Sequence, residues 1–325
     1  MFQRFRFLFL ILLCFGILFP LGCAKTGFSF WPKNGPTDEY DVHAETMPAA
    51  ISPPNENLPQ IVDRPTWMLN ALAGIDRPER PKIVIVIDDL GLNSKRAAQI
   101  TKLPGPLTLA YLPYARKLPE QTKLARQNGH ELMIHMPMQP LNNTVDPGPD
   151  ALRADLSQQE LTHRLKKNLS QFDGYVGINN HMGSAFTQDR KGLEIVMEIL
   201  RERGLLYLDS RTSADSVAET VAREYRVATT GRDVFLDHVI SAEFIAESLA
   251  KVEDIAERHG TVIAIGHPHP ETAEALSHWL PTLERKGFQL VPLSHVMAER
   301  DPRVKAAVSD TAMLAKGEGK LRRPN

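Results

Sequence analysis

The chain has 325 residues, a formal net charge of −1 at pH 7 and 42% hydrophobic residues. This length is enough for one large domain or two small ones, and the balanced charge gives no indication of a nucleic-acid partner. Its only two cysteines, Cys14 and Cys23, lie near the N-terminus, so the rest of the chain has no internal disulfide and no cysteine nucleophile.

The N-terminal residues have the pattern of an export signal. Arg4 and Arg6 precede an almost wholly apolar run from Phe7 to Leu21, in the order of a signal's basic and apolar regions. The run ends in Pro20-Leu21-Gly22-Cys23, which resembles the lipobox of bacterial lipoproteins, where the cysteine is acylated. We therefore expect export and retention at the membrane, on the periplasmic side of the cell envelope. Residues 1–23 are then a plain signal, a lipoprotein signal with Cys23 as the lipidation site, or an uncleaved anchor.

Two further segments are expected to lie outside the folded domain. Residues 24–80 are rich in proline and have little apolar periodicity, which predicts an extended tether. Within it, Trp67 to Leu72 has the composition of a short helix that packs on the domain. Residues 298–325 are charged and rich in small residues, which predicts a frayed tail. The folded domain is therefore expected to cover residues 81–297.

From Lys82 onward, short apolar runs alternate with amphipathic stretches. This alternation predicts an α/β fold of successive βα units with a mainly parallel sheet. The expected strands cover 82–87, 107–112, 131–135, 175–178, 205–208, a weaker segment near Val227, 261–265 and 288–293. The expected helices cover 93–102, 118–128, 157–171, 189–203, 213–225, 241–259 and 271–286. Seven or eight such units in one domain favour a barrel or near-barrel, with a doubly wound open sheet as the alternative.

Acidic residues and histidines follow the expected strands. Asp88 and Asp89 follow the first strand, His135 the third, His181 the fourth, Asp209 the fifth and His267 the seventh. Because the carboxyl ends of parallel strands share one rim, these side chains are expected to converge. Imidazoles and carboxylates in one pocket are the ligand types of a catalytic zinc or a similar divalent ion. The aspartate pair alone is equally compatible with one helix cap and one solvated side chain.

Five short motifs occur in order along the domain. They are Ile-Asp-Asp-Leu-Gly at 87–91, Glu-Leu-Met-Ile-His-Met-Pro-Met at 131–138, Asn-Asn-His-Met-Gly-Ser at 179–184, Leu-Asp-Ser-Arg-Thr at 208–212 and Ile-Gly-His-Pro at 265–268. Together they resemble the divergent polysaccharide deacetylase family, over about Lys82 to Val296. The resemblance implies a distorted (β/α) barrel of about seven strands, related to metal-dependent enzymes that remove N- or O-acetyl groups from chitin-like polymers and peptidoglycan.

The resemblance also implies catalytic roles by position. Asp88 would be the general base, Asp89 a metal ligand and His267 the general acid. A divalent ion lowers the pKa of bound water and polarises the acetyl carbonyl. Asp88 would then take the proton of the water, and His267 would protonate the departing amine or alkoxide.

The sequence departs from the relatives at the metal histidines. Relatives take two from one His-x-x-x-His segment, but the residue four positions after His135 is Gln139. His181 is therefore the candidate for the second histidine, which makes Asp89, His135 and His181 the expected ligands of a divalent metal such as zinc. Asp209 is expected to be either a further ligand or, as we favour, a carboxylate that orients a histidine.

These observations favour a secreted or envelope-anchored, metal-dependent carbohydrate deacetylase. It would be a hydrolase of non-peptide carbon–nitrogen bonds that acts on acetylated polysaccharide or peptidoglycan. Because Gln139 replaces a metal histidine, a catalytically degenerate carbohydrate-binding or envelope scaffold protein is the alternative. A barrel phosphoesterase is a third hypothesis, for which Arg211 is the one cation near the strand ends that could hold a phosphate.

Overall fold

The structure is a computed structural model that describes residues 64–72 and 77–300. The expected export signal with Cys23, most of the expected tether and the chain beyond Arg300 lie outside the described residues. None of the helices within these two ranges is long and apolar enough to cross a membrane.

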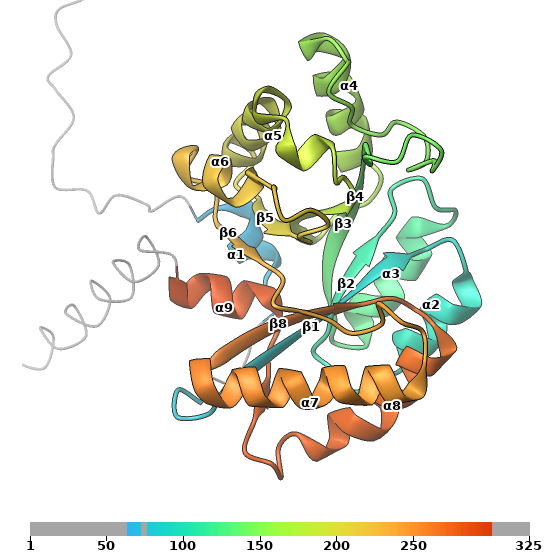
Figure 1. The fold of residues 1–325 in the computed structure, drawn as a ribbon, viewed down its shortest axis with the longest axis vertical. Coiled ribbons are helices and arrows are strands. Elements are labelled where there is room, and N and C mark those ends of the chain that lie inside the picture. The colour runs from blue at the N-terminus through green and yellow to red at the C-terminus, as the bar shows by residue number, and fades with distance from the viewer. Residues whose placement is uncertain (1–63, 73–76, 301–325) are drawn as a thin grey trace, which may run out of the picture. The chain divides into compact units, whose positions relative to one another are not determined.

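The described strands form one parallel sheet (Figure 1). They are β1 (Lys82–Leu90), β2 (Thr108–Tyr111), β3 (Glu131–Met138), β4 (Tyr175–Met182), β5 (Leu206–Asp209), β6 (Thr229–Gly231), β7 (Val234–Phe235), β8 (Thr261–Gly266) and β9 (Gln289–Leu290). Their order is β6-β5-β4-β3-β2-β1-β8-β7, and β9 pairs with β1. The β-branched run of β1 is buried on both faces, as in other parallel sheets that helices cover.

The link between β6 and β7 closes the sheet into a barrel. The two strands lie at opposite ends of the strand order, yet only Arg232 and Asp233 separate them. A link this short spans at most about 11 Å, so the two edges of the sheet must lie close together. The backbone N–H of Arg232 donates to Asp209 O at 3.0 Å, and that of Asp233 donates to Ile263 O at 2.8 Å. This closure confirms the distorted (β/α) barrel and rules out the open doubly wound sheet.

Helices cover the outside of the barrel (Figure 1). The described helices are α1 (Thr66–Asn70), α2 (Ser94–Ile100), α3 (Leu118–Gln127), α4 (Gln158–Leu169), α5 (Arg190–Glu202), α6 (Ala218–Glu224), α7 (Ala242–His259), α8 (Pro270–Trp279) and α9 (Leu293–Arg300). Side-chain caps at Asn93, Ser157, Asp189 and Ser241 accept backbone N–H groups in the first turns of α2, α4, α5 and α7. These are residue types that favour the start of a helix.

The C-terminal elements differ from the sequence prediction. The expected strand over 288–293 is reduced to the two residues of β9, and the chain becomes helical again at Leu293. The N–H groups of Leu293 and Ser294 donate to Thr108 Oγ1 at 3.0 Å and Glu131 Oε1 at 3.1 Å. These capping groups come from the distant strands β2 and β3, so the local sequence around Leu293 does not reveal them. The expected helix 271–286 ends at Trp279, where Pro281 interrupts regular hydrogen bonding.

Alternate residues of the strands face two different cores. Ile83, Ile85 and Ile87 of β1 pack in the large core between the sheet and the helices. Val84 and Val86 belong to a smaller cluster inside the barrel. The other strands add Ala110, Met133, Val176, Leu206, Leu208, Ile263 and Ile265 to this inner cluster. The period of two in β-strands therefore separates the inside of the barrel from its helix-covered outside.

Helices α1 and α9 close the amino-terminal end of the barrel. Trp67 of α1 is 1% exposed and belongs to the inner cluster with Leu293 and Val296 of α9. The N–H of Trp67 donates to the carbonyl of Gly204, just before β5 begins. Residues 66–70 of the expected tether thus form the short helix that Trp67 indicated. The carboxyl-terminal end of the barrel is left for the polar residues that follow the strands.

Candidate active site

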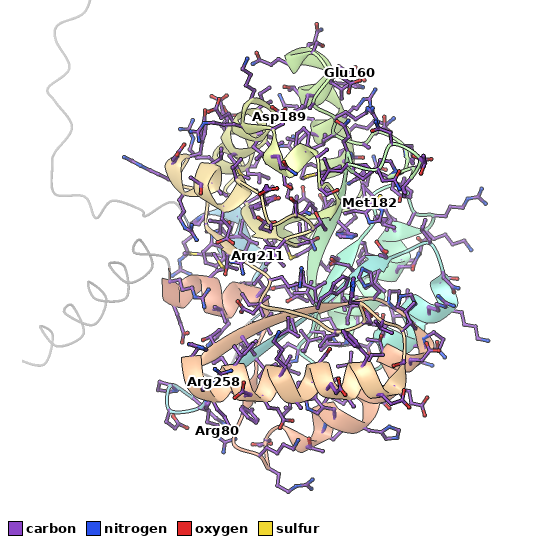
Figure 2. All side chains as sticks on the ribbon, viewed as in Figure 1. Arg80, Glu160, Met182, Asp189, Arg211 and Arg258 are labelled. Atoms are coloured by element: carbon purple, nitrogen blue, oxygen red, sulfur yellow. The ribbon has the colours of Figure 1, made fainter. Side chains whose placement is uncertain are left out.

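The polar site continues the inward-facing rows of the strands. Two positions beyond the inner residues Val86, Met133, Leu208 and Ile265 stand Asp88, His135, Ser210 and His267. Because inward-facing residues are two apart along a strand, these side chains also face the interior. They replace apolar packing with polar contacts at the carboxyl end of the barrel. In Figure 2, Met182 at the end of β4 and Arg211 just after β5 mark this end.

Asp89 joins the site because the backbone of β1 leaves the regular strand conformation. The alternation of the strand would point its side chain outward, in line with Ile87. Asp89 instead has a left-handed φ of 55°, and the pairing of β1 with β2 is irregular between Ile87 and Leu90. A non-glycine residue in this conformation costs about 1–2 kcal/mol, and such strain is concentrated at functional sites. Two adjacent carboxylates can therefore serve one site.

Three candidate ligand atoms lie within one small triangle. Asp89 Oδ1 is 2.8 Å from His181 Nδ1 and 3.2 Å from His135 Nε2, and the two nitrogens are 3.2 Å apart. A tetrahedral ion with bonds of 2.0–2.2 Å separates its ligand atoms by roughly 3.3–3.6 Å. A small expansion of the triangle would therefore make it one face of such a site, with the fourth position open.

The bonding of Asp89 also fits a metal ligand. Its Oδ1 is buried and has no hydrogen bond of good geometry, although two imidazole nitrogens lie within 3.2 Å. Atoms that point toward a shared ion have this arrangement, because their lone pairs converge on the ion rather than on each other. Burial acts to raise the pKa of Asp89, but the imidazoles of His135 and His181 outweigh it and hold the pKa well below its usual range. Asp89 is therefore a carboxylate, as a ligand must be.

Asn179 determines which nitrogen of His135 is available. Its amide nitrogen donates to Asp88 Oδ1 at 2.7 Å and to Ser210 Oγ at 3.1 Å, so its amide oxygen faces His135 Nδ1 at 2.9 Å. The Nδ1 atom must then carry the proton, which leaves the lone pair of Nε2 for a ligand. The role of Asn179 was not predicted from the sequence. The feature that could have indicated an inward-facing side chain is that polar Asn179 directly follows Ile178 of the outer core.

Asp88 is the buried member of the aspartate pair. It is 2% exposed, and its Oδ2 lies 3.7 Å from His135 Nε2. Burial raises the pKa of Asp88 above its ordinary value, against the opposing charges of His135 and His267. The two neighbouring carboxyl groups thus differ in pKa, which is the usual sign that they have different roles.

His267 is held by a buried aspartate that the sequence analysis missed. Its Nδ1 lies 2.9 Å from Asp237 Oδ1, and its backbone N–H donates to Asp237 Oδ2 at 2.6 Å. The hydroxyl of Thr272 donates to the same oxygen at 2.8 Å. Burial acts to lower the pKa of His267, but the hydrogen bond to Asp237 and the charge of Asp88 raise it to about 9. His267 Nε2 faces the site, 3.9 Å from Asp89 Oδ2.

Asp209 faces away from this group. It continues the outward row of β5 after Tyr207, which packs in the outer core. Its oxygens accept the backbone N–H of Arg211 at 2.8 Å and the hydroxyl of Ser216 at 2.7 Å. The carboxylate of Asp209, at the end of β5, therefore binds the β5–α6 loop, and none of its hydrogen bonds within the described residues reaches a histidine. Leu208 packs in the inner cluster. Because side chains alternate along a strand, the sequence could have predicted that Asp209 faces outward.

Two other residues singled out by the sequence have structural contacts. Gln139 Oε1 accepts the N–H of Ala154 at 2.9 Å, and its backbone oxygen accepts the N–H of Ala185 at 3.0 Å. Gln139 thus joins the loops after β3 and β4, whereas His181 supplies the third atom of the triangle with Asp89 and His135. The guanidinium of Arg211 donates to Glu219 Oε1 at 2.6 Å. An arginine bound in this way is a poor phosphate grip, which weighs against the phosphoesterase hypothesis.

The chain is similar to proteins of known sequence. A protein of uncharacterised function from Haemophilus influenzae is 34% identical over 215 residues, which cover 66% of this chain and 76% of that protein. The uncharacterised protein YibQ of Escherichia coli K12 is 35% identical over 202 residues, 62% of this chain and 63% of that protein. The match thus spans less than two thirds of the length of the Escherichia coli relative.

A solved structure and a family profile complete the comparison. The crystal structure of an uncharacterised protein from Agrobacterium tumefaciens C58 superposes with a TM-score of 0.69 at 27% identity, over 71% of this chain and 95% of that chain. The profile of the divergent polysaccharide deacetylases matches residues 85–297. This range includes the aspartate pair, the three histidines of the site (His135, His181 and His267) and Asp237. The chain therefore belongs to the divergent polysaccharide deacetylase family.

Proposed function

We propose that the chain is a metal-dependent carbohydrate deacetylase of the cell envelope. It hydrolyses the N- or O-acetyl groups of an acetylated polysaccharide or of peptidoglycan. The observation that carries the proposal is the triangle of Asp89, His135 and His181 ligand atoms, with Asp88 and His267 on its borders. Membership of the deacetylase family supports it.

The donor set is suited to zinc. Two imidazoles and one carboxylate, with an open position, are the usual ligands of catalytic zinc sites. Asp89, His135 and His181 would hold the ion, and Asn179 would orient His135. When bound, the ion would polarise the acetyl carbonyl and make water nucleophilic near neutral pH.

Asp88 and His267 would perform the two proton transfers. Water adds to the acetyl carbon and gives a proton to Asp88, whose Oδ1 is held by Asn179. The bond from the acetyl carbon to nitrogen or oxygen then breaks, and the leaving group takes a proton from His267 Nε2. Asp237 holds Nδ1 of His267, so the opposite nitrogen is the one that faces the site. The products are acetate and a free amine or hydroxyl group, and each transfer is worth roughly 10² to 10⁴ in rate.

The test combines metal content with acetate release. Wild type and variants are loaded with zinc, analysed for metal, and assayed on N-acetylated chito-oligosaccharides and on peptidoglycan. His181→Ala should lose both metal and turnover, whereas Asp88→Asn should keep the metal and lose turnover. His163→Ala, an exposed histidine on α4, is the matched control and should change neither.

The same measurements can contradict the proposal. Full zinc occupancy in His181→Ala would remove His181 from the ligand set. A wild-type protein that binds zinc but releases no acetate from any acetylated glycan would favour the carbohydrate-binding scaffold.

Export and membrane retention are part of the proposal. They are supported by Arg4 and Arg6 before the apolar run and by the lipobox-like Gly22-Cys23. If Cys23 is acylated, Cys23→Ser should release the protein from the membrane fraction or block its processing. An unchanged membrane fraction would favour an uncleaved anchor, and native protein in the cytosol would contradict both.

A further inference from the structure

Exposed aliphatic side chains are concentrated at the catalytic end of the barrel. Among the described residues, seven large hydrophobic side chains are exposed, and five of them lie on loops that follow β1, β3 and β7. These five, which we call the apolar rim, are Leu92 (62% exposed), Leu141 (64%), Val145 (41%), Val239 (50%) and Ile240 (52%). The strand order β3-β2-β1-β8-β7 and a spacing of about 4.8 Å between strands place these loops along about 20 Å of one rim.

Four cations lie on the same rim. Lys95 and Arg96 are in the first turn of α2, and Arg116 and Lys117 directly precede α3; all four are exposed. We call them the cationic rim. The side-chain amide of Gln121 donates to Gly91 O at 3.0 Å and to Arg116 O at 2.8 Å. This double contact joins the two loops and keeps the cationic rim next to Leu92.

The cationic rim contributes nothing evident to the stability of the fold. Within the described part of the chain none of the four side chains forms an ion pair, and the nearby Glu120 of α3 pairs with none of them. Cations at the start of a helix are also disfavoured by the helix dipole. By contrast, the guanidinium of Arg211, which follows β5, forms an ion pair with Glu219. Unpaired cations beside exposed aliphatic side chains therefore indicate an external partner.

We propose that this rim docks on the surface of an anionic phospholipid bilayer. The apolar rim would enter the boundary between headgroups and acyl chains, and the cationic rim would bind lipid phosphates. Alkyl side chains next to lysine and arginine are the composition of interfacial membrane contacts. In this orientation Asp89 and His267 face the lipid surface. This membrane contact is a property additional to the proposed hydrolysis.

The length of the N-terminal segment permits this orientation. The described chain begins near α1, at the opposite end of the barrel from the rim. About 40 residues lie between Cys23 and Arg64, and they can span up to about 130 Å when extended. A domain of this size has a radius of gyration of about 17 Å. A chain held at its N-terminus can therefore still turn its catalytic rim to the same membrane.

The test uses the full chain with a single reporter at one end of the barrel. In a Cys14→Ser, Cys23→Ser background, Val239→Cys carries an environment-sensitive dye on the rim, and Leu69→Cys carries it on α1. Each protein is reconstituted with vesicles of phosphatidylcholine alone or with added phosphatidylglycerol, both containing a brominated quencher lipid. The Val239 reporter should be quenched only in the anionic vesicles, and 1 M salt should reverse the quenching. The Leu69 reporter should remain unquenched.

Charge variants test the electrostatic part of the contact. Each cation near an anionic bilayer is worth roughly fivefold in affinity, so Lys95→Gln with Arg116→Gln should lower the ratio of docked to undocked protein about 25-fold. The matched control, Lys166→Gln with Lys251→Gln, removes two exposed lysines away from the rim and should have no effect.

Three results would overturn the proposal. The first is no quenching of the Val239 reporter in anionic vesicles, and the second is equal quenching of the Leu69 reporter. The third is binding of a soluble acidic polysaccharide that depends on Lys95 and Arg116, without docking on anionic vesicles. The partner of the rim would then be a polymer and not a membrane.

Discussion

Asp237→Asn tests how the buried aspartate controls His267. In the wild type, the Asp237 carboxylate accepts the Nδ1 proton of His267, the backbone N–H of the same residue and the hydroxyl of Thr272. An asparagine can keep the latter two contacts through its amide oxygen, but it then presents its NH₂ group to Nδ1. The variant therefore loses the partner that favours the imidazolium and gains a donor that opposes it.

The size of the effect follows from the pKa of His267. Its rise from 6.5 to about 9 corresponds to about 3 kcal/mol of preference for the protonated ring. The hydrogen bond to Asp237 supplies the largest part of this preference and the charges of Asp88 and Asp89 add to it, while burial opposes it. Because the folded-state pKa is raised, the stabilisation is complete below pH 6.5 and is lost as the pH rises through about 9. In the variant, we expect the pKa of His267 to fall to its ordinary value or below.

The assay uses protein stripped of metal, because a bound cation would itself lower the pKa of His267. NMR titration, assigned with His267→Gln, gives the pKa, and urea unfolding at several pH values gives the stability. The difference between wild type and Asp237→Asn should be largest near pH 6 and shrink toward pH 10. Asp233→Asn, whose amide oxygen can still accept the N–H of Ile263 and which touches no histidine, should show a difference independent of pH over this range. A His267 pKa that stays near 9 in Asp237→Asn would refute the reasoning.

Asn179→Ala should lower metal affinity about 10- to 100-fold, because His135 loses the acceptor for its Nδ1 proton; competition with a chromogenic chelator measures it, and unchanged affinity would contradict this role. Trp67→Ala should cost about 3–5 kcal/mol in urea unfolding, because this side chain is 1% exposed, whereas Leu69→Ala on the exposed face of the same helix should cost less than about 0.5 kcal/mol. Gly177→Ala should lower the melting temperature, since its Cβ would lie 2.1 Å from a backbone oxygen of β5; a melting temperature equal to that of the wild type would show that the two strands can separate.

Local patterns were sufficient to predict most of the helices and strands. The β-branched run after Lys82 predicts a buried parallel strand, and Ser157 and Ser241 cap helices where the sequence placed their starts. The failures occur where distant residues determine the structure. Helix α9 begins at Leu293 because Thr108 and Glu131 cap it from other strands.

The candidate site was predictable in its location and only partly in its members. The convergence of strand ends brought Asp88, His135 and His267 together, because each continues an inward row. Asp237 escaped because the stretch from Arg232 to His238 has no clear periodicity. The role of Asp237 depends on its contacts with His267, which follows the neighbouring strand β8, and with Thr272 of α8.

The difference between Asp89 and Asp209 shows what decides membership of the site. Both follow an inward residue by one position, so regular strand geometry would turn both carboxylates outward. Asp209 obeys this geometry, and its carboxylate accepts hydrogen bonds from the β5–α6 loop. Asp89 departs from it through a φ of 55°, which turns its carboxylate toward His135 and His181. Two adjacent aspartates can face one site only if the backbone breaks the alternation between them, and the left-handed Asp89 in β1 is that break.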